Sequence, residues 1–275
     1  GIAAQSVGVS QAAYDEALKY ARERKQFDTE IVKFPAVYDM IARIKAKLDA
    51  GRSILYQTAR YVDIYKALED ISRERKLTAE ERQELKKYSR LADAFTPLAK
   101  GMNSEYANQN TYDAIQVHGG SGFIMEYKSQ RLYRDARIFS IYEGTTQLQV
   151  VAAIRYISNG TYLGIIKEML EKDVAEELKP LKARVEEMVK LYEQALEYVK
   201  EAQDQEMHDF LARRLYNMTC EIIMSLLILE DATRSAELFA KSANVYVRMA
   251  QANVFGEHAY ITNFIKEDLS SFRAE

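Results

Sequence analysis

The residues best suited to chemistry lie in one stretch, from Gln116 to Gln147, which reads QVHGGSGFIMEYKSQRLYRDARIFSIYEGTTQ. Glu143 is the candidate base in this stretch, because the helix expected to follow it exposes unpaired backbone N–H groups that favour an anion. We also expect the apolar residues Ile138, Phe139 and Ile141 to shield its carboxylate partly from water. Such shielding strengthens a carboxylate as a base. These residues indicate a base beside an anion-binding backbone, and they leave the substrate open.

The composition excludes several classes of protein. The 38 basic and 41 acidic side chains leave a net charge of −3, which gives no electrostatic reason to expect nucleic acid. No run of 18 apolar residues occurs, so we expect no membrane span. The single cysteine, Cys220, excludes an internal disulfide, and its apolar neighbours predict a buried helical position. The histidines are too scattered for metal-ligand spacing, so we expect no metal site.

The chain that must position these residues is predicted to be all-α. Only 11 Gly and 3 Pro occur in 275 residues, and helix-forming residues are abundant. The charged residues 69–87 indicate a solvated connection, in which Thr78 and Glu81 form a capping box. Pro97 is expected to kink or break the helix that contains it. Apolar residues at helical spacing predict helices over residues 2–24, 35–65, 79–117, 129–136, 145–157, 176–202, 204–232 and 234–266.

Three separated pieces of the first 160 or so residues resemble the C-terminal helical domain of the acyl-CoA dehydrogenase family. They are Arg24-Lys25-Gln26-Phe27, Gln116-Val117-His118-Gly119-Gly120, and Arg131 to Gln147, which includes the typical run Tyr142-Glu143-Gly144-Thr145. The resemblance implies an up-and-down helical bundle in residues 1–163. A second helical bundle in residues 164–275 is similar to the additional C-terminal domain of larger bacterial members. The resemblance also implies that the family's N-terminal helical domain and middle β-domain are absent, so we expect an inactive fragment.

The resemblance implies FAD-dependent α,β-dehydrogenation of fatty acyl-CoA thioesters, a step of fatty acid β-oxidation. Glu143 would remove the α proton while a hydride passes from the β carbon to flavin N5. The backbone N–H of the base and a flavin ribityl hydroxyl would stabilise the thioester oxygen. Tyr142 and Gly144 would line the acyl-CoA site. The residues expected to contact FAD are Thr145 and Gln147 and, in the site of a neighbouring subunit, Arg24, Gln26, Phe27, Gln116, Gly119 and Gly120.

The same resemblance implies a homodimer or homotetramer in the bacterial cytoplasm, with an electron-transfer flavoprotein as electron acceptor. Two positions depart from the family pattern: Asp28 replaces a usual Gly, and Pro35 replaces a Gln that contacts the cofactor in several members. An acyl-CoA oxidase of the same superfamily is an alternative. A non-catalytic helical assembly module is another, although scaffolding requires neither Glu143 nor Arg24. The sequence leaves the acyl chain length, the electron acceptor and the oligomer open.

Overall fold

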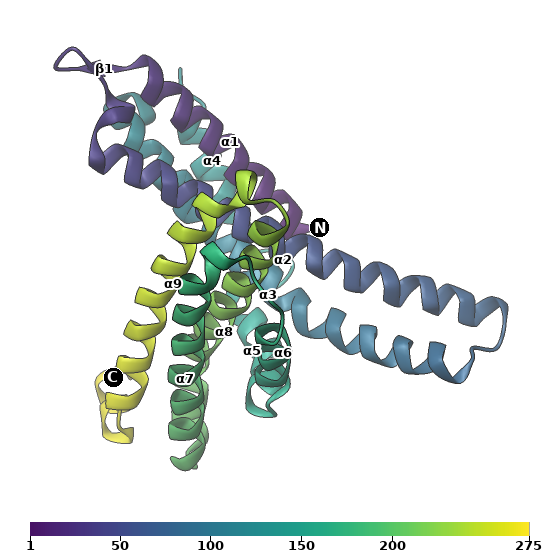
Figure 1. Cartoon of the computed structure of the whole chain (residues 1–275). Helices are drawn as coiled ribbons and strands as arrows, with labels where there is room; N and C mark the ends of the chain where they lie inside the picture. The colour runs from purple at the N-terminus through teal and green to yellow at the C-terminus, as the bar shows by residue number, and fades with distance from the viewer. Residues whose placement is uncertain (275) are drawn as a thin grey trace. The chain divides into compact units, whose positions relative to one another are not determined.

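The computed structural model describes residues 1–274 and confirms the all-α fold class, with one helical bundle followed by another. The chain divides into two compact units, Gly1–Gln149 (unit 1) and Val150–Glu275 (unit 2). Each unit is built almost wholly of α-helices (Figure 1). The proposed domain boundary between residues 163 and 164 stays a prediction. No helix among residues 1–274 is both long and apolar enough to span a bilayer.

Three helices of unit 1 pack on one another, and a fourth covers part of them. α1, α2 and α3 contact each other pairwise, and α4 contacts α1 and α3. Their bounds are α1 Ile2–Glu23, α2 Pro35–Glu74, α3 Ala79–His118 and α4 Ser129–Ala136, with 3₁₀ turns at Ile31–Lys33, Gly119–Gly122 and Arg137–Ser140.

Small residues allow these helices to approach closely. A stripe of small residues on α1 is fully buried at Ala13, Ala17 and Ala21. It packs in one cluster with residues of α2 and α3. Between α2 and α3, a Cβ added at Gly51 would collide with the Asn103 side chain, whose amide donates a 3.2 Å hydrogen bond to the Gly51 carbonyl. The crossing therefore depends on a residue without a side chain.

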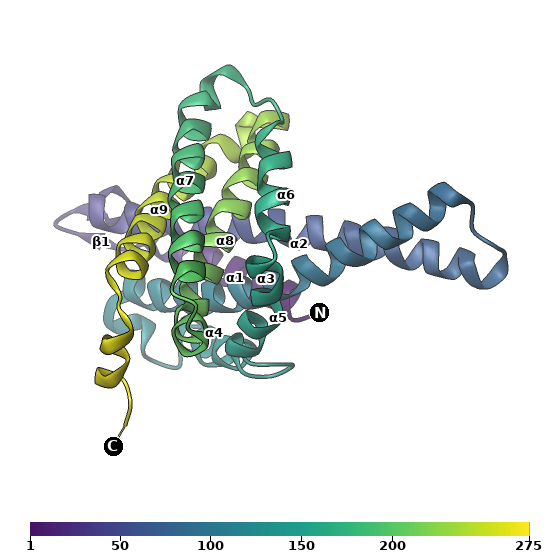
Figure 2. The same cartoon turned by 90° about the horizontal axis from the view of Figure 1, so that it is seen from below.

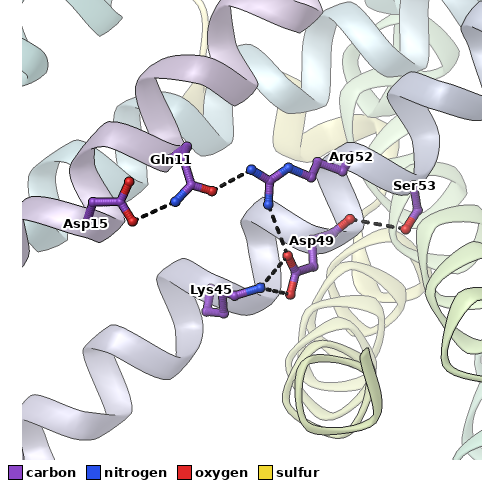
Figure 3. A network of polar contacts seen from close by, with 6 residues as sticks. All are labelled: Gln11, Asp15, Lys45, Asp49, Arg52 and Ser53. Carbon is purple, nitrogen blue, oxygen red and sulfur yellow. Dashed lines mark hydrogen bonds and ion pairs between the residues drawn. The ribbon is translucent and has the colours of Figure 1, made fainter. Parts of the chain in front are cut away.

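A polar network fixes α1 against α2 (Figure 3). Asp49 is 1% exposed, and its carboxylate accepts a 2.5 Å hydrogen bond from Lys45 and a 3.4 Å one from Arg52. Arg52 also donates to Gln11 on α1, which in turn donates to Asp15 at 2.7 Å. A buried carboxylate is costly unless it is paired, so these contacts are needed to keep Asp49 in the core.

The distal halves of α2 and α3 form a helical hairpin that projects beyond α1 (Figures 1 and 2). The expected end of the second helix near residue 65 is wrong, and so is the solvated connection over residues 69–87, because α2 continues to Glu74 and α3 begins at Ala79. The charged residues lie on helix surfaces, where Arg73 pairs with Asp70 at 2.9 Å. The capping box is confirmed, since Thr78 accepts from the Glu81 N–H and Glu81 accepts from the Thr78 N–H.

Two further local predictions fail. α3 runs unbroken through the buried Pro97, so the predicted break is wrong, whereas the predicted kink stays a prediction. Tertiary packing overrides the local preference against helix here. A two-stranded hairpin also lies between α1 and α2, where no strand was expected. Its strands are β1 Lys25–Gln26 and β2 Thr29–Glu30, and they are too short to give an alternating pattern in the sequence.

Unit 2 is a regular packing of long helices. α7, α8 and α9 contact one another, and α6, which was not predicted, contacts α8. Cys220 is fully buried in α8, as predicted, and burial raises the pKa of its thiol. α5 begins in unit 1 and continues into unit 2. The helices are α5 Thr146–Ser158, α6 Thr161–Leu170, α7 Lys179–Glu201, α8 Gln205–Arg234 and α9 Ala236–Asn263, with 3₁₀ turns at Glu176–Leu178 and Lys266–Ser271.

Candidate functional site

Glu143 lies in a tight turn between the 3₁₀ turn Arg137–Ser140 and α5. The backbone N–H groups of Ile141 and Tyr142 both donate to the Ile138 carbonyl, at 2.9 and 3.1 Å. Glu143 and Gly144 then take positive φ angles of 52° and 87°. Two successive left-handed residues reverse the chain sharply, and such a geometry is costly at the non-glycine position.

The carboxylate of Glu143 faces outward, which corrects one expectation. Glu143 is exposed, and so are two of the residues expected to shield it, Ile138 and Ile141, at 48% and 44%. Side chains three residues apart share a face of a 3₁₀ turn. Phe139 and Tyr142 therefore point together toward the core, with ring centroids 6.3 Å apart, while Ile138 and Ile141 share the outer face.

A buried lysine contacts the turn from the side of α3. Lys100 is 7% exposed, and its Nζ donates to the carbonyl oxygen of Gly144 at 2.5 Å. The Gln149 amide donates to the same oxygen at 3.3 Å. Five residues further along α3, Glu105 accepts a 2.6 Å hydrogen bond from Thr146 at the start of α5. Sequence reasoning missed Lys100, although a lysine within the apolar stripe of the third helix was a detectable signal.

A hollow of about 400 Å³ adjoins the start of α5. Two residues predicted to contact FAD, Thr145 and Gln147, line this hollow, whereas Glu143 does not. Thr145 also caps α5, because its hydroxyl accepts a 3.3 Å hydrogen bond from the Leu148 N–H. Arg137 lies in the wall of the hollow and donates to Ser140 at 2.5 Å. The wall of the hollow thus contains a helix N-terminus and the Arg137 cation, which suit an anionic group, together with the Glu105 carboxylate, which bonds the Thr146 hydroxyl.

Arg24, Gln26 and Phe27 lie at the exposed hairpin that follows α1. Gln26 pairs with Thr29, so Phe27 and Asp28 form a two-residue turn with φ angles of 50° and 57°. A turn of this kind requires positive φ at both central residues, and Asp tolerates that geometry better than most residues. Asp28 can therefore replace the family's usual Gly here. Phe27 is 83% exposed at the tip.

An aromatic cluster packs the glycine-rich segment against the end of α1, from which the hairpin continues. The Tyr20 ring on α1 stacks on His118 at 4.4 Å, and Tyr127 packs edge-on against both rings. The Tyr20 hydroxyl donates to Ser121 at 3.2 Å. His118 is buried and fixed, since its Nδ1–H donates to the Ala114 carbonyl at 2.7 Å. The cluster connects the end of α1 with the end of α3.

Gln116, Gly119 and Gly120 are exposed at this end of α3. Gly119 has φ of 60°, and a Cβ at either glycine would meet nothing within 4 Å. Their backbone is thus open to close approach by a ligand. Gly122 serves packing instead, because a Cβ there would lie 2.7 Å from the Ile115 carbonyl oxygen.

The structure separates the predicted site residues into two groups. Tyr142, beside Glu143, donates to Gln5 near the start of α1. Ser121 of the glycine-rich segment instead contacts Tyr20 near the end of α1, from which the hairpin continues. Fifteen residues separate Gln5 from Tyr20, which corresponds to about 22 Å of helix. One copy of unit 1 therefore presents two surfaces, and the predicted residues do not form a single pocket. Among residues 1–274, no group of three or more metal-ligating side chains is placed to hold a metal ion.

Comparison with known proteins assigns both units to one family. The family model described as "Acyl-CoA dehydrogenase, C-terminal domain" matches residues 1–156, and the model "Acyl-CoA dehydrogenase C terminal" matches residues 158–269. A crystal structure of an acyl-CoA dehydrogenase from Bacillus anthracis in complex with FAD covers 100% of this chain and 48% of its own, with a TM-score of 0.69 and 22% identity, which establishes the fold.

Two curated relatives are more similar in sequence. The chain is 41% identical over 149 residues to the caffeyl-CoA reductase-Etf complex subunit CarC of Acetobacterium woodii, covering 54% of this chain and 33% of that protein. It is 31% identical over 156 residues to the cyclohexane-1-carbonyl-CoA dehydrogenase of Geobacter metallireducens, covering 57% and 35%. The chain thus spans about a third of the length of these relatives. From the family models, the chain belongs to the acyl-CoA dehydrogenase family.

Proposed function

We propose that these 275 residues are the C-terminal part of an FAD-dependent enzyme that interconverts an acyl-CoA thioester and its α,β-unsaturated counterpart. In the direction of dehydrogenation, one carboxylate oxygen of Glu143 removes the proton from the α carbon of the thioester. The electron pair of that C–H bond moves into the new double bond, and a hydride leaves the β carbon. FAD, when bound, supplies the acceptor for this hydride.

The observation that supports this role for Glu143 is its placement on a tightly fixed turn. A catalytic base must be held within hydrogen-bond reach of the proton it removes. Glu143 is exposed, its φ is 52°, and hydrogen bonds fix the backbone before and after it. We propose that Tyr142 and Gly144, which flank it, line the acyl-CoA site. We further propose that the Glu143 backbone N–H stabilises negative charge that develops on the thioester oxygen.

The exposed residues have the chemistry that FAD requires. Arg24 offers a guanidinium for a pyrophosphate, and Phe27 offers an apolar surface at 83% exposure. Gly119 and Gly120 leave their backbone open to a nucleotide. We propose that this group, with Gln26 and Gln116, binds FAD, and that Thr145 and Gln147 bind it through the hollow at α5.

The separation of the two groups supports a homo-oligomer. Along α1, about 22 Å lies between Gln5, which contacts Tyr142, and Tyr20, which contacts the glycine-rich segment. We propose that the hairpin group completes the FAD site of a neighbouring subunit, in a homodimer or homotetramer. We also propose an electron-transfer flavoprotein as redox partner, because one relative is named as a subunit of an Etf complex. The bacterial cytoplasm remains the predicted location.

The reverse reaction is a second candidate. The relative at 41% identity is named a caffeyl-CoA reductase, and another relative acts on a cyclic acyl group according to its name. In the reductive direction Glu143 would return a proton to the α carbon. Fatty acyl substrates are therefore one proposed class, and aryl or cyclic acyl-CoA thioesters are another.

Anaerobic titration of the complete protein that contains this chain tests the proposal. Its visible spectrum should contain a flavin band near about 450 nm, and a saturated acyl-CoA that is a substrate should bleach it. Straight-chain and cyclic acyl-CoAs are compared for dehydrogenation. Reduced protein mixed with unsaturated thioesters tests the reductase direction, and oxygen consumption tests the oxidase alternative.

The matched variants are Glu143→Gln and Glu168→Gln, the latter an exposed glutamate of α6. Loss of the base should slow bleaching at least about 100-fold at unchanged flavin content, since a general base contributes roughly 10²–10⁴-fold. The Glu168 variant should react as the unmodified protein does. Normal turnover by Glu143→Gln would refute the assigned base, and a protein that cannot bind FAD would favour the assembly-module alternative.

A further inference from the structure

A buried ammonium group lies directly beneath the turn that carries Glu143. Lys100 is in the middle of α3 and is 7% exposed, which is unusual for lysine. Its Nζ lies 2.5 Å from the carbonyl oxygen of Gly144, a residue 44 positions further along the chain. Burying a cation against a backbone carbonyl costs desolvation free energy, so the contact calls for an explanation beyond packing.

We propose that Lys100 is a positioning residue for Glu143, holding the Gly144 carbonyl so that the left-handed turn presents the carboxylate in one orientation. This inference rests on the proposed function, in which Glu143 is the base. Lys100 is not expected to contact the substrate. It would act only through the turn.

The geometry of the turn explains why it needs such a contact. Glu143 has φ of 52° and Gly144 has φ of 87°. Left-handed geometry is unfavourable for a glutamate, so without external contacts the turn would relax toward other conformations. A hydrogen bond from a charged donor is roughly twice as strong as one between neutral groups. The Lys100 ammonium therefore fixes the turn more firmly than the neutral Gln149 amide, whose bond to the same oxygen is longer at 3.3 Å.

α3 holds both sides of the junction between the turn and α5. Lys100 binds the Gly144 carbonyl, and Glu105 accepts a 2.6 Å hydrogen bond from the Thr146 hydroxyl. The two α3 side chains carry opposite charges and flank the short segment that follows Glu143. Rigid placement by a helix is the support that a catalytic group needs.

The charges around Lys100 support the same role. Burial lowers the pKa of its ammonium, while the negative charges of Glu105 and Glu143 act in the opposite direction and favour the charged form. Two carboxylates near Lys100 thus favour retention of its positive charge, which the contact with the Gly144 carbonyl uses.

A second buried lysine provides a matched control. Lys47 on α2 is 5% exposed, similar to Lys100, but its Nζ pairs with Asp113 on α3 at 4.0 Å. Lys47 lies in the same unit, and its replacement by methionine removes one positive charge, as the Lys100→Met substitution does. A general loss of stability should therefore appear in both variants, whereas an effect on the Glu143 turn should appear only in one.

The test compares Lys100→Met, Lys100→Gln, Lys100→Arg and Lys47→Met in the complete protein, with rates expressed per bound flavin. Lys100→Met should lower kcat for flavin bleaching by about 10- to 100-fold, because small displacements of a reacting group have effects of this size. Its KM should stay unchanged, because Lys100 does not contact the substrate. Lys100→Gln should have an intermediate kcat, and Lys100→Arg, which keeps the positive charge, should restore kcat. Lys47→Met should leave kcat unchanged.

The outcomes separate this inference from the proposed function. A Lys100→Met enzyme with unchanged kcat, beside an inactive Glu143→Gln enzyme, would overturn the inference alone. Equal losses of kcat in Lys100→Met and Lys47→Met would reduce Lys100 to a structural residue. If Lys100→Met fails to bind flavin, the Gln and Arg variants decide, since the inference requires Arg to exceed Gln in rate. An active Glu143→Gln enzyme would overturn the proposed function itself.

Discussion

The two units differ in where their backbone departs from regular helix. Among the described residues, unit 1 places three non-glycine residues at positive φ, Phe27, Asp28 and Glu143, and all three lie in or beside motifs that resemble a cofactor or substrate site. Unit 2 has one such residue, Gln203, in the short connection between α7 and α8. Strained backbone persists only where the surrounding structure holds it, and it gathers at functional sites. The difference supports the proposal that the chemistry resides in unit 1.

The buried side chains differ in the same way. Unit 1 buries the charged residues Lys47, Asp49 and Lys100 among its helices. Unit 2 buries one charged residue among its described residues, Glu221, within a continuous buried run on α8 from Met218 to Leu229. A helix that is buried on all sides is the centre of a packed core. Unit 2 therefore has the character of a packing module. Three experiments test this difference between the units.

The largest effect is expected from replacing a glycine of positive φ by alanine in each unit. Gly144→Ala should lower the rate per bound flavin about 100-fold, because it distorts the Glu143 turn and places a Cβ 2.8 Å from Gln149 Nε2. Gly160→Ala, at φ of 77° with open space around it, should leave that rate unchanged. Each should reduce the free energy of unfolding by about 1 kcal/mol. Full activity of Gly144→Ala would show that the turn geometry is not needed.

A cavity in unit 2 should reduce stability without affecting chemistry. Ile223→Ala removes a fully buried side chain from α8, so denaturant unfolding of this chain should show a loss of about 2–5 kcal/mol. Leu238→Ala, at a side chain that is 65% exposed, is the control and should change stability by less than about 0.5 kcal/mol. A reduced bleaching rate at full flavin content in the Ile223 variant would instead give unit 2 a part in catalysis.

The smallest effect concerns the tip of the α2–α3 hairpin in unit 1. Arg75 and the Thr78 N–H hold the pKa of Glu81 at about 2, below its usual 4.5. The folded state thus favours the charged carboxylate, so its contribution is present above pH 4.5 and is lost as the pH falls toward 2. Hydrogen-exchange protection at the start of α3, corrected for intrinsic rates, should fall between pH 5 and pH 3. The Glu81→Gln variant should lack this change, and equal pH dependence in both proteins would exclude the capping box as its origin.

Most of the helices could be predicted from local sequence. The range 129–136 matches α4, and the predicted limits of α1, α3, α5 and α8 lie within two residues of the observed ones. Spacing of apolar residues determines these elements, since each must bury one face. The end of α2 could not be predicted in this way, because five of its last nine residues are charged and it is supported by its antiparallel neighbour α3. α6 was missed because a ten-residue helix gives little periodicity.

The sequence by itself determined the fold class, the motifs and the position of Glu143 within them. It could not determine which of these residues lie together. The cluster of Tyr20, His118 and Tyr127 and the contact of Lys100 with Gly144 join residues far apart in the chain. Such contacts depend on how helices cross and which faces meet, and local propensity carries no information about either. Only the tertiary structure placed a buried lysine beneath the turn that carries the proposed base.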